Sequence, residues 1–164
     1  MSNTKFKFDL GVVGLGYVGL PLAVEAASNG LKVIGYDINS ERVEMINNGS
    51  SPIEDISNEE LSKSLIDFHS TTESKELSQC KNIVISVPTP LTDYQPDLSF
   101  VVNAAKSVGE NLVRNQVVIL ESTTYPGTTT EVLIPNLEKM SGLKAGEDFF
   151  VGYSPERIDP GNEV

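Results

Sequence analysis

The stretch FDLGVVGLGYVGLPLAVEAASNGLKVIGYD, residues 8–37, decides the fold. Its apolar run at 8–14 predicts a strand, and residues 18–29, rich in Leu, Ala and Val, predict a helix. A second apolar run at 31–37 has the continuous hydrophobicity of a strand that is buried on both faces. Strand, helix and strand in this order predict the first βαβ unit of an open parallel sheet.

The turn between the first strand and the helix reads GLGYVG (14–19) and matches the G-x-G-x-x-G fingerprint of dinucleotide-binding folds. Gly14 allows the tight turn, Gly16 lets backbone N–H groups approach a pyrophosphate, and Gly19 lets the helix pack closely on the strand. Pro21 then fits only within the first helical turn, where its missing N–H is not needed. Because folds that bind FAD and S-adenosylmethionine share this turn, the fingerprint alone leaves the ligand open.

Asp37 ends the second strand, 18 residues after Gly19. A carboxylate at this place accepts hydrogen bonds from the adenosine ribose hydroxyls and repels a 2′-phosphate, so it favours NAD over NADP. Arg42, five residues further on, could pack on the adenine or could instead favour NADP. The plainer alternative is a glycine turn that binds nothing, with Asp37 as a helix cap. The strand, the fingerprint, the helix and the acidic strand end together favour NAD.

The alternation of predicted helices and strands continues along the chain. Ser57 with Glu60, and Thr128 with Glu131, have the spacing of capping boxes at the starts of two helices. The pattern predicts one domain over residues 1–164, with the Rossmann α/β fold: a doubly wound parallel sheet, helices on both faces and strand order 3-2-1-4-5-6. Further strands are expected at 66–70, 82–87, 116–122 and 148–153, helices at 42–48 (capped by Asn39), after 57, at 100–113 and at 128–140, and a polar loop at 94–98.

Composition excludes several classes of protein. The 12 Lys and Arg stand against 23 Asp and Glu, a net charge of −11, which argues against a nucleic-acid binder. No apolar run approaches the roughly 20 residues that span a bilayer, and residues 1–9 contain no secretory signal. A cytoplasmic protein that does not bind membranes is therefore expected. With one cysteine, Cys80, and one histidine, His69, neither an internal disulfide nor a metal site is expected.

Polar segments follow the later strands. In an open parallel sheet the ligands lie beyond the carboxyl ends of the strands. Three segments stand at such ends: VPTP (87–90), ESTTYPGT (121–128) and SPER (154–157). We expect them to meet the glycine turn at one edge of the sheet, where a nicotinamide and a substrate would lie.

Each of these residues also has a plainer interpretation. Thr89 and Pro90 could form only a turn, and Thr128 is better explained as a helix cap than as a ligand contact. Glu156 and Arg157 could be a solvated ion pair worth under about 1 kcal/mol.

Taken together, these segments resemble the nucleotide-sugar 6-dehydrogenase family, which includes UDP-glucose and UDP-N-acetylhexosamine dehydrogenases. The resemblance rests on GLGYVGLP (14–21), Asp37, VPTP, ESTTYPGT and SPERIDPG (154–161), in the right order over nearly the whole chain. SPERIDPG is similar to the N-acetylated branch, whereas the UDP-glucose branch usually has Pro-Glu-Phe-Leu. The sequence is most similar to UDP-N-acetylglucosamine 6-dehydrogenases of the Vi-antigen and O-antigen type, and the manno and galacto epimers stay open.

The resemblance implies an NAD-dependent oxidoreductase that oxidises a UDP-N-acetylhexosamine twice at carbon 6, to the uronate, for surface polysaccharide biosynthesis. The aldehyde formed first is captured by a cysteine, and the resulting thioester is hydrolysed after the second oxidation. The resemblance assigns catalysis to Thr123 and Glu156, which would position or polarise water and substrate oxygens. It assigns substrate binding to Glu156, Arg157 and Ile158. The expected cofactor-binding residues are Gly14, Gly16, Tyr17, Val18, Gly19, Asp37, Arg42, Val87, Thr89, Pro90 and Thr124.

The sequence also departs from the complete family pattern. The family's nucleophilic Cys, its Lys, its central helix and its UDP-binding domain lie after the matched region, and Cys80 is not at the matching place. The chain stops four residues after Pro160 without a closing element, so we expect a truncated domain that binds NAD but does not turn over by itself. The full-length enzyme is expected to be a homo-oligomer.

Two other functions stay open. The chain could be the NAD-binding module of another hydroxyacid-type dehydrogenase, such as a 6-phosphogluconate relative. It could also be a non-catalytic NAD-binding module.

Overall fold

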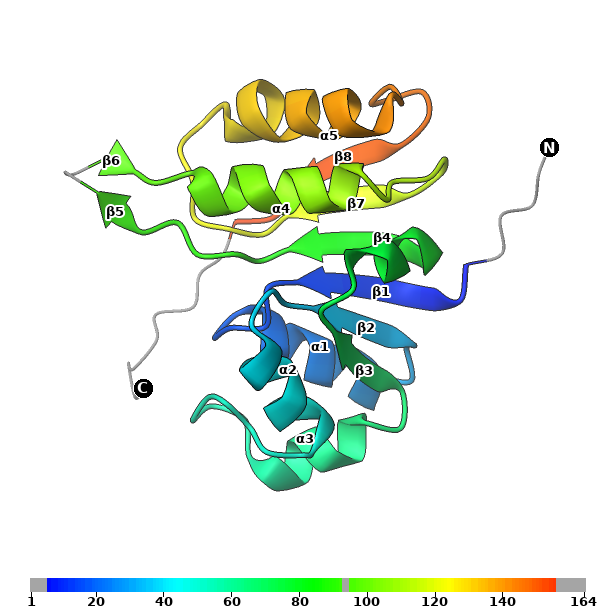
Figure 1. Ribbon diagram of the computed structural model, residues 1–164, viewed down its shortest axis with the longest axis vertical. Coiled ribbons are helices and arrows are strands. Elements are labelled where there is room, and N and C mark those ends of the chain that lie inside the picture. The colour runs from blue at the N-terminus through cyan, green and yellow to red at the C-terminus, as the bar shows by residue number, and fades with distance from the viewer. Residues whose placement is uncertain (1–5, 93–94, 156–164) are drawn as a thin grey trace.

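A six-stranded, wholly parallel sheet forms the centre of the protein (Figure 1). The computed structural model describes residues 6–92 and 95–155. The strand order is β3-β2-β1-β4-β7-β8, which confirms the predicted Rossmann arrangement, because it is 3-2-1-4-5-6 when only the strands of this sheet are counted. The strands are β1 (Phe8–Val13), β2 (Val33–Tyr36), β3 (Phe68–Thr71), β4 (Cys80–Ile85), β7 (Val117–Leu120) and β8 (Phe150–Tyr153).

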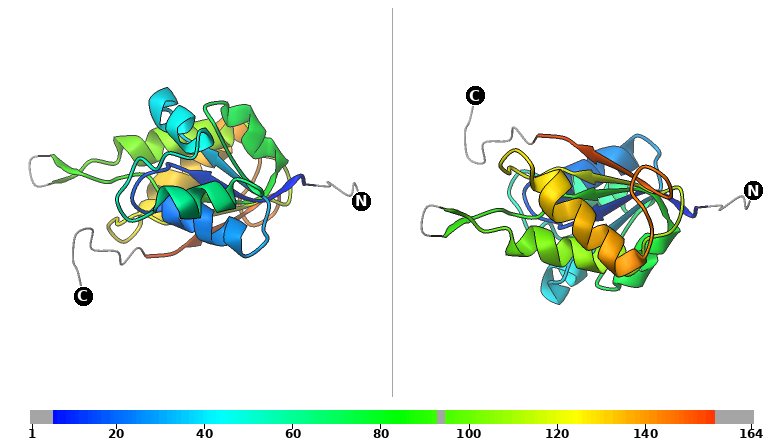
Figure 2. Two further views of the ribbon diagram at one scale, coloured as in Figure 1. Left: turned by 90° about the horizontal axis from the view of Figure 1, so that it is seen from below. Right: turned by 90° about the horizontal axis from the view of Figure 1, so that it is seen from above.

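Helices cover both faces of this sheet (Figure 2). One layer contains α4 and α5, and the other contains α1 and α3. The α-helices are α1 (Gly19–Ser28), α2 (Ser40–Asn47), α3 (Asn58–Ser64), α4 (Ser99–Gly109) and α5 (Ile134–Ser141). A 3₁₀ turn at Ser74–Gln79 lies between β3 and β4, and a π-helical turn at Thr129–Leu133 leads directly into α5.

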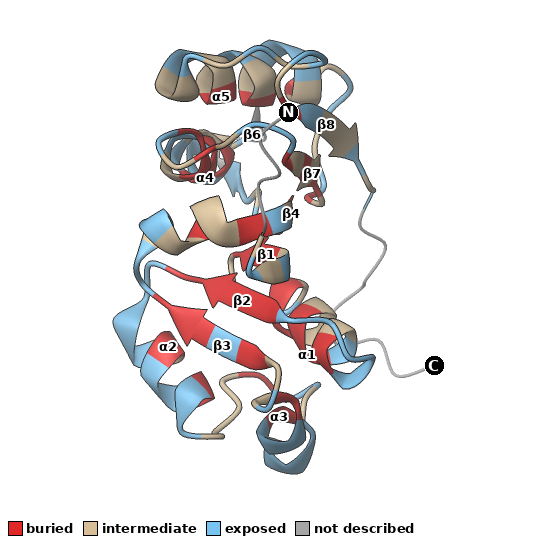
Figure 3. Ribbon diagram, turned by 90° about the vertical axis from the view of Figure 1, so that its right-hand side faces the viewer, coloured by how far each residue is buried: buried red, intermediate tan, exposed pale blue. Residues whose placement is uncertain are grey.

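The core lies in two layers because successive strand residues point to opposite faces. In β1, Val13 packs with the α4 and α5 layer, whereas Val12 packs with the α1 and α3 layer. All four residues of β2 are buried, as Figure 3 shows in red. This double burial explains why the strand positions are continuously apolar rather than alternating.

The helix starts that were predicted from Asn39 and Ser57 are confirmed. The Asn39 side chain accepts the N–H of Arg42 at 3.1 Å and caps α2. Ser57 and Glu60 form both hydrogen bonds of a capping box at the start of α3. Pro21 lies in the first turn of α1, as expected. Among the described residues, no helix is long and apolar enough to cross a membrane.

The capping box predicted for Thr128 and Glu131 is wrong. Thr128 already has helical backbone angles (φ −53°, ψ −39°), and its hydroxyl donates to the carbonyl of Tyr125 at 2.8 Å. An N-cap residue needs an extended backbone. The chain instead turns at Gly127 (φ +99°) and enters α5 through the π-helical turn.

Two smaller differences follow from weak local signals. The polar loop predicted at 94–98 contains β6 (Gln95–Pro96), which pairs antiparallel with β5 (Leu91–Thr92). A ladder of two residues is too short to produce a periodic pattern. The helix predicted at 100–113 spans Ser99–Gly109.

Candidate functional site

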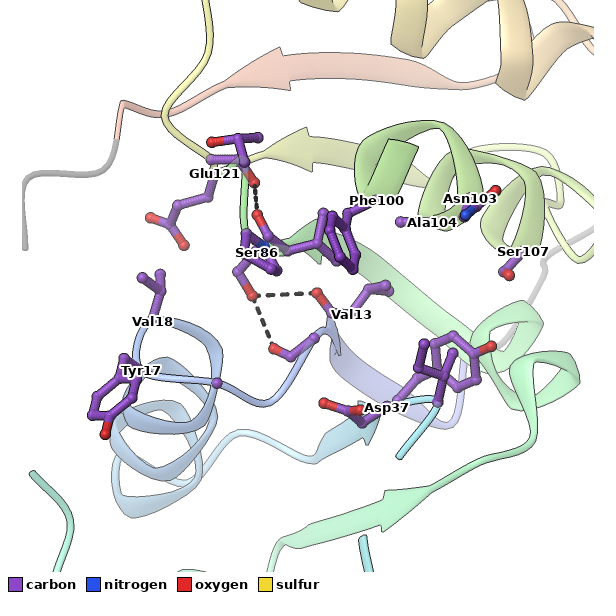
Figure 4. Close-up of a pocket in the computed structure, with 18 of the residues that line it drawn as sticks. Val13, Tyr17, Val18, Asp37, Ser86, Phe100, Asn103, Ala104, Ser107 and Glu121 are labelled. Atoms are coloured by element: carbon purple, nitrogen blue, oxygen red, sulfur yellow. Dashed lines mark hydrogen bonds between the residues drawn. The ribbon is translucent and has the colours of Figure 1, made fainter. Parts of the chain in front are cut away.

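A cavity of about 600 Å³ opens at the carboxyl ends of β1, β2, β4 and β7 (Figure 4). This is the edge where the fold class predicts ligand binding. The cavity brings together nine of the residues that the sequence predicted for the site: Gly14, Gly16, Tyr17, Val18, Asp37, Arg42, Val87, Thr89 and Thr123.

The glycine turn leaves room for a ligand on one side and none on the other. Gly14 has φ +91°, which strains any side chain. A Cβ atom at Gly19 would lie 1.8 Å from the carbonyl oxygen of Gly14, so this glycine lets α1 pack against the turn. A Cβ atom at Gly16 would meet no protein atom within 4 Å. The backbone at Gly16 therefore faces open space beside the amino-terminal end of α1, as a pyrophosphate requires.

Asp37 links the glycine turn to the start of α2. Its side chain is 5% exposed. Oδ2 accepts the N–H of Leu15 at 2.8 Å and Nη1 of Arg42 at 2.9 Å, and Oδ1 accepts the N–H of Asn39 at 2.9 Å. A carboxylate oxygen offers two lone pairs, so Oδ1, with one donor, has the capacity to accept a further hydrogen bond. The plainer interpretation of Asp37 as the helix cap is wrong, because Asn39 caps α2.

Ser86 ties the end of β4 to the same turn. Its hydroxyl lies 3.1 Å from the carbonyl oxygen of Gly14 and 3.3 Å from that of Val13, and the two carbonyls share its single hydrogen. Ser86 was not among the residues predicted for the site. The available signal was a hydroxyl directly after the apolar strand that ends at Ile85.

Two hydrogen bonds from side-chain hydroxyls connect the segments that follow β4 and β7. Thr89 Oγ1 donates to the carbonyl of Thr123, and Ser122 Oγ donates to the carbonyl of Val87 at 2.8 Å. These reciprocal hydrogen bonds hold the two strand ends in one arrangement. Thr123 is consequently presented to the cavity.

Three other predicted site residues that the structure describes do not line the cavity. Gly19 acts through close packing, and neither Pro90 nor Thr124 is among the lining residues. Glu156, Arg157 and Ile158 lie outside the described residues.

Glu121 brings a second carboxylate to the cavity, at the end of β7. The hydroxyl of Ser154 lies 3.4 Å from its Oε1, and the N–H of Ser154 donates to the carbonyl of Leu120 at 2.9 Å. In Figure 4, Glu121 and Val18 lie on one side of the cavity, and Asp37 lies on the other side. The chain therefore leaves β8 at the Glu121 side of the cavity.

The wall formed by α4 was missed by the sequence analysis. Its lining residues share the spacing i, i+3, i+4, i+7 of one helix face. The sequence did contain a signal for this wall: two of these positions are polar, and the helix follows a central strand. The wall consists of Phe100, Asn103, Ala104 and Ser107.

Cys80 is the first residue of β4, so it lies at the amino-terminal ends of the strands, away from the cavity at their carboxyl ends. The residue is fully buried, and burial raises the pKa of the thiol to about 12, with a smaller contribution from Glu76. The thiol is therefore protonated near neutral pH and cannot serve as a nucleophile. Burial and protonation together indicate an inert, structural thiol.

Comparison with known proteins identifies a family. Residues 8–164 match the NAD-binding domain of the UDP-glucose/GDP-mannose dehydrogenase family. The UDP-N-acetyl-D-glucosamine 6-dehydrogenases of Pseudomonas aeruginosa and Salmonella typhi are 46% and 43% identical to this chain, over 93% and 94% of it. The structure of a UDP-D-ManNAc dehydrogenase from Pyrococcus horikoshii superposes with a TM-score of 0.86, at 41% identity, over 93% of this chain and 37% of that chain.

The chain spans 36% of the length of the two curated relatives. The matching domain is the family's NAD-binding domain, so the NAD cofactor predicted from the glycine turn and Asp37 is confirmed.

Proposed function

Because this chain belongs to the UDP-glucose/GDP-mannose dehydrogenase family, as its NAD-binding domain, we propose that the complete protein oxidises a UDP-N-acetylhexosamine twice at carbon 6, to the uronate. The observation that carries this proposal is the position of Thr123, which faces the same cavity as the glycine turn and Asp37. A residue from the end of β7 can thus meet both a dinucleotide and a substrate. Bound NAD would accept the hydride from carbon 6.

The cofactor-binding part of the proposal rests on contacts of the chain itself. The open backbone at Gly16 and the amino-terminal end of α1 would hold the diphosphate, with Tyr17 and Val18 beside it. Oδ1 of Asp37 would accept a hydrogen bond from the adenosine ribose, and Arg42 would border the adenosine. Val87, Thr89, Pro90 and Thr124 belong to the strand ends at the nicotinamide side.

The catalytic part of the proposal rests on Thr123 and Glu156. The Thr123 backbone is held by the hydroxyl of Thr89, so its side chain has a fixed origin from which to orient water or a substrate oxygen. Ser154 is hydrogen-bonded to Leu120 and Glu121 at the cavity edge, and Glu156, Arg157 and Ile158 follow it by two to four residues. That short separation supports a role for Glu156 in catalysis and for all three residues in substrate binding.

UDP-N-acetylglucosamine is the substrate we propose first. The curated relatives named for this sugar are 46% and 43% identical, slightly more than the 41% of the mannosamine enzyme. The small difference keeps the manno and galacto epimers as outcomes of the test. The uronate product would supply surface polysaccharide biosynthesis.

We place the complete enzyme in the cytoplasm as a homo-oligomer, with no nucleic-acid or membrane partner. The net charge of −11 supports the absence of a nucleic-acid partner, since a polyanion would be repelled. Sedimentation of the complete protein tests the oligomeric state.

The decisive experiment measures NADH formed per sugar by the complete protein. UDP-N-acetylglucosamine is expected to yield two NADH per sugar and a uronate, whereas UDP-glucose, the control, is expected to react slowly. Glu156→Gln should abolish oxidation while NAD binding is retained. One NADH per sugar, or oxidation of a hydroxyacid instead, would contradict the proposal, and unchanged activity in Glu156→Gln would contradict the role of that residue.

A further inference from the structure

The α4 face of the cavity carries two polar side chains with no hydrogen-bond partner among residues 6–92 and 95–155. Within the part of the chain that the structure describes, neither the Asn103 side-chain amide nor the Ser107 hydroxyl forms a hydrogen bond, and the side chain of Asn111 donates to the backbone carbonyl of Ser107, not to its hydroxyl. By contrast, the cavity-lining hydroxyls of Ser86 and Thr89 each donate to a backbone carbonyl. The polar groups of α4 are therefore available to a ligand.

The geometry of α4 turns these groups toward the cavity. The opposite side of the helix carries Val101, Ala105 and Val108, which are fully buried in the core beside β4 and β7. Asn103 is exposed and Ser107 is half-buried, and both line the cavity. The helix period places them on one face, one turn apart. Core packing thus fixes the helix and, with it, the direction in which Asn103 points.

This wall stands at the adenosine end of the cavity. In Figure 4, Asn103, Ser107 and Asp37 lie on one side of the glycine turn, and Tyr17, Val18 and Glu121 lie on the other. An acidic residue at the end of the second strand marks the adenosine ribose. With the diphosphate at the glycine turn and the ribose at Asp37, the base extends toward α4.

The space beside Asp37 suits a flat base. Ile38, which is 80% exposed, lies on the β2 side of the cavity and offers an apolar surface. Ala104 on the α4 side also lines the cavity and adds only a methyl group to that wall. A base in this slot would present its edge to the helix.

We propose that Asn103, assisted by Ser107, recognises the 6-amino edge of the adenine of NAD and so selects adenine over other bases. A carboxamide offers one acceptor and two donors, and adenine offers an amino donor next to a ring-nitrogen acceptor. Asn pairs with adenine through both groups in nucleic-acid complexes. The inference rests on the dinucleotide placement proposed above.

The test compares two dinucleotides by calorimetric titration of this chain. One is NAD, and the other is its ethenoadenine analogue, in which a two-carbon bridge ties the 6-amino nitrogen to ring nitrogen 1 and removes the amino hydrogens. We expect the chain to bind NAD about tenfold more tightly than the analogue, from the loss of a paired contact. Asn103→Ala should bind NAD about tenfold more weakly and the two dinucleotides with nearly equal affinity.

Ser99→Ala is the matched control, because Ser99 is an exposed polar residue of the same helix that does not line the cavity. This variant should keep the wild-type affinity for NAD and the preference for NAD over the ethenoadenine analogue. If the chain disfavoured the analogue only because it is larger than NAD, Asn103→Ala would bind NAD as tightly as the wild type does. That result would overturn the inference.

The outcomes separate this inference from the proposal on which it rests. NAD binding that is intact but indifferent to Asn103→Ala overturns base recognition and leaves the cofactor site standing. Absence of saturable NAD binding to the folded wild-type chain overturns both.

Discussion

Asp37 and Arg42 form an ion pair with a distance of 2.9 Å between Oδ2 and Nη1, and the same carboxylate oxygen accepts the N–H of Leu15 at 2.8 Å. One buried oxygen therefore holds both the glycine turn and the cation beside the adenosine end of the cavity. Nη1 of Arg42 is therefore already engaged by Asp37 and would have to leave this carboxylate to meet a 2′-phosphate. We therefore expect the choice of NAD over NADP to depend on this ion pair as well as on the carboxylate's own charge.

Asp37→Ala is expected to weaken NAD binding by at least about tenfold, because the ribose acceptor is lost and the Leu15 N–H is left without a partner. The ratio of NADP to NAD affinity should rise, since Arg42 becomes free to meet a 2′-phosphate. Calorimetry with both dinucleotides measures the two effects. Glu44→Ala, an exposed acidic residue of α2, is the control for charge alone. An unchanged NADP to NAD ratio would contradict the role of the pair.

Two alanine substitutions in the glycine turn should separate folding from binding. A methyl group at Gly16 meets no protein atom within 4 Å, so Gly16→Ala should fold normally and lose NAD affinity by more than about tenfold. A methyl group at Gly19 would lie 1.8 Å from the Gly14 oxygen, so Gly19→Ala should destabilise the fold by about 3 kcal/mol or more. Thermal unfolding and NAD titration measure both. Normal NAD binding by Gly16→Ala would show that the diphosphate lies elsewhere.

The sequence predicted this fold well where local signals agree with burial. The apolar runs of β1 and β2 and the turn GLGYVG belong to a unit of about 30 residues whose geometry is set locally. The caps at Asn39 and Ser57 were also predictable, because each depends on contacts within three residues.

Features that depend on tertiary contacts were not predictable in the same way. Thr128 has the sequence of a cap, but the turn at Gly127 brings its hydroxyl to Tyr125 and the chain continues through a π-helical turn. The bonds of Ser86 to Gly14 and of Thr89 to Thr123 join residues 72 and 34 positions apart. No local pattern reports such pairings. The α4 wall depends on tertiary contacts too, because the packing of Val101, Ala105 and Val108 in the core decides which face of the helix meets the cavity.

Cys80 should resist alkylation and make the stability depend on pH in alkaline solution. With a thiol pKa of about 12 in the fold, only about one molecule in 10⁴ carries the thiolate at pH 8. Iodoacetamide should therefore label Cys80 only after unfolding. Because the pKa is raised from its ordinary value of 9.0, the unfolded chain ionises first, and stability should fall as pH rises from about 9 toward 12.

The same pH series on Cys80→Ala isolates the thiol from other alkaline titrations. The free energy of unfolding of the wild type should fall more steeply than that of Cys80→Ala, by at most about 1.4 kcal/mol per pH unit. Parallel curves, or rapid labelling of the folded wild type, would show that the thiol is not held in its neutral form.

The hydroxyl of Thr89 is expected to set the position of Thr123. Thr89→Val keeps the side-chain shape but removes the hydroxyl that donates to the Thr123 carbonyl. In the complete protein, kcat should fall by about tenfold, because a small misplacement of a reacting group costs at least that much. The dissociation constant for NAD should change less than the rate, since the glycine turn and Asp37 are untouched.

A comparison of three variants makes the Thr89 prediction specific. Thr89→Ser restores the donor and should recover most of the rate, a result that shape alone would not produce. Thr130→Val is the matched control, because the Thr130 hydroxyl also donates to a backbone carbonyl, that of Gly127, but does not line the cavity. Its kcat should stay near the wild-type value. Equal losses of kcat in Thr89→Val and Thr130→Val would mean only that the strand ends have become less rigid, and they would contradict the prediction. A loss of kcat in Thr89→Val that Thr89→Ser restores would show that the Thr89 hydroxyl positions Thr123.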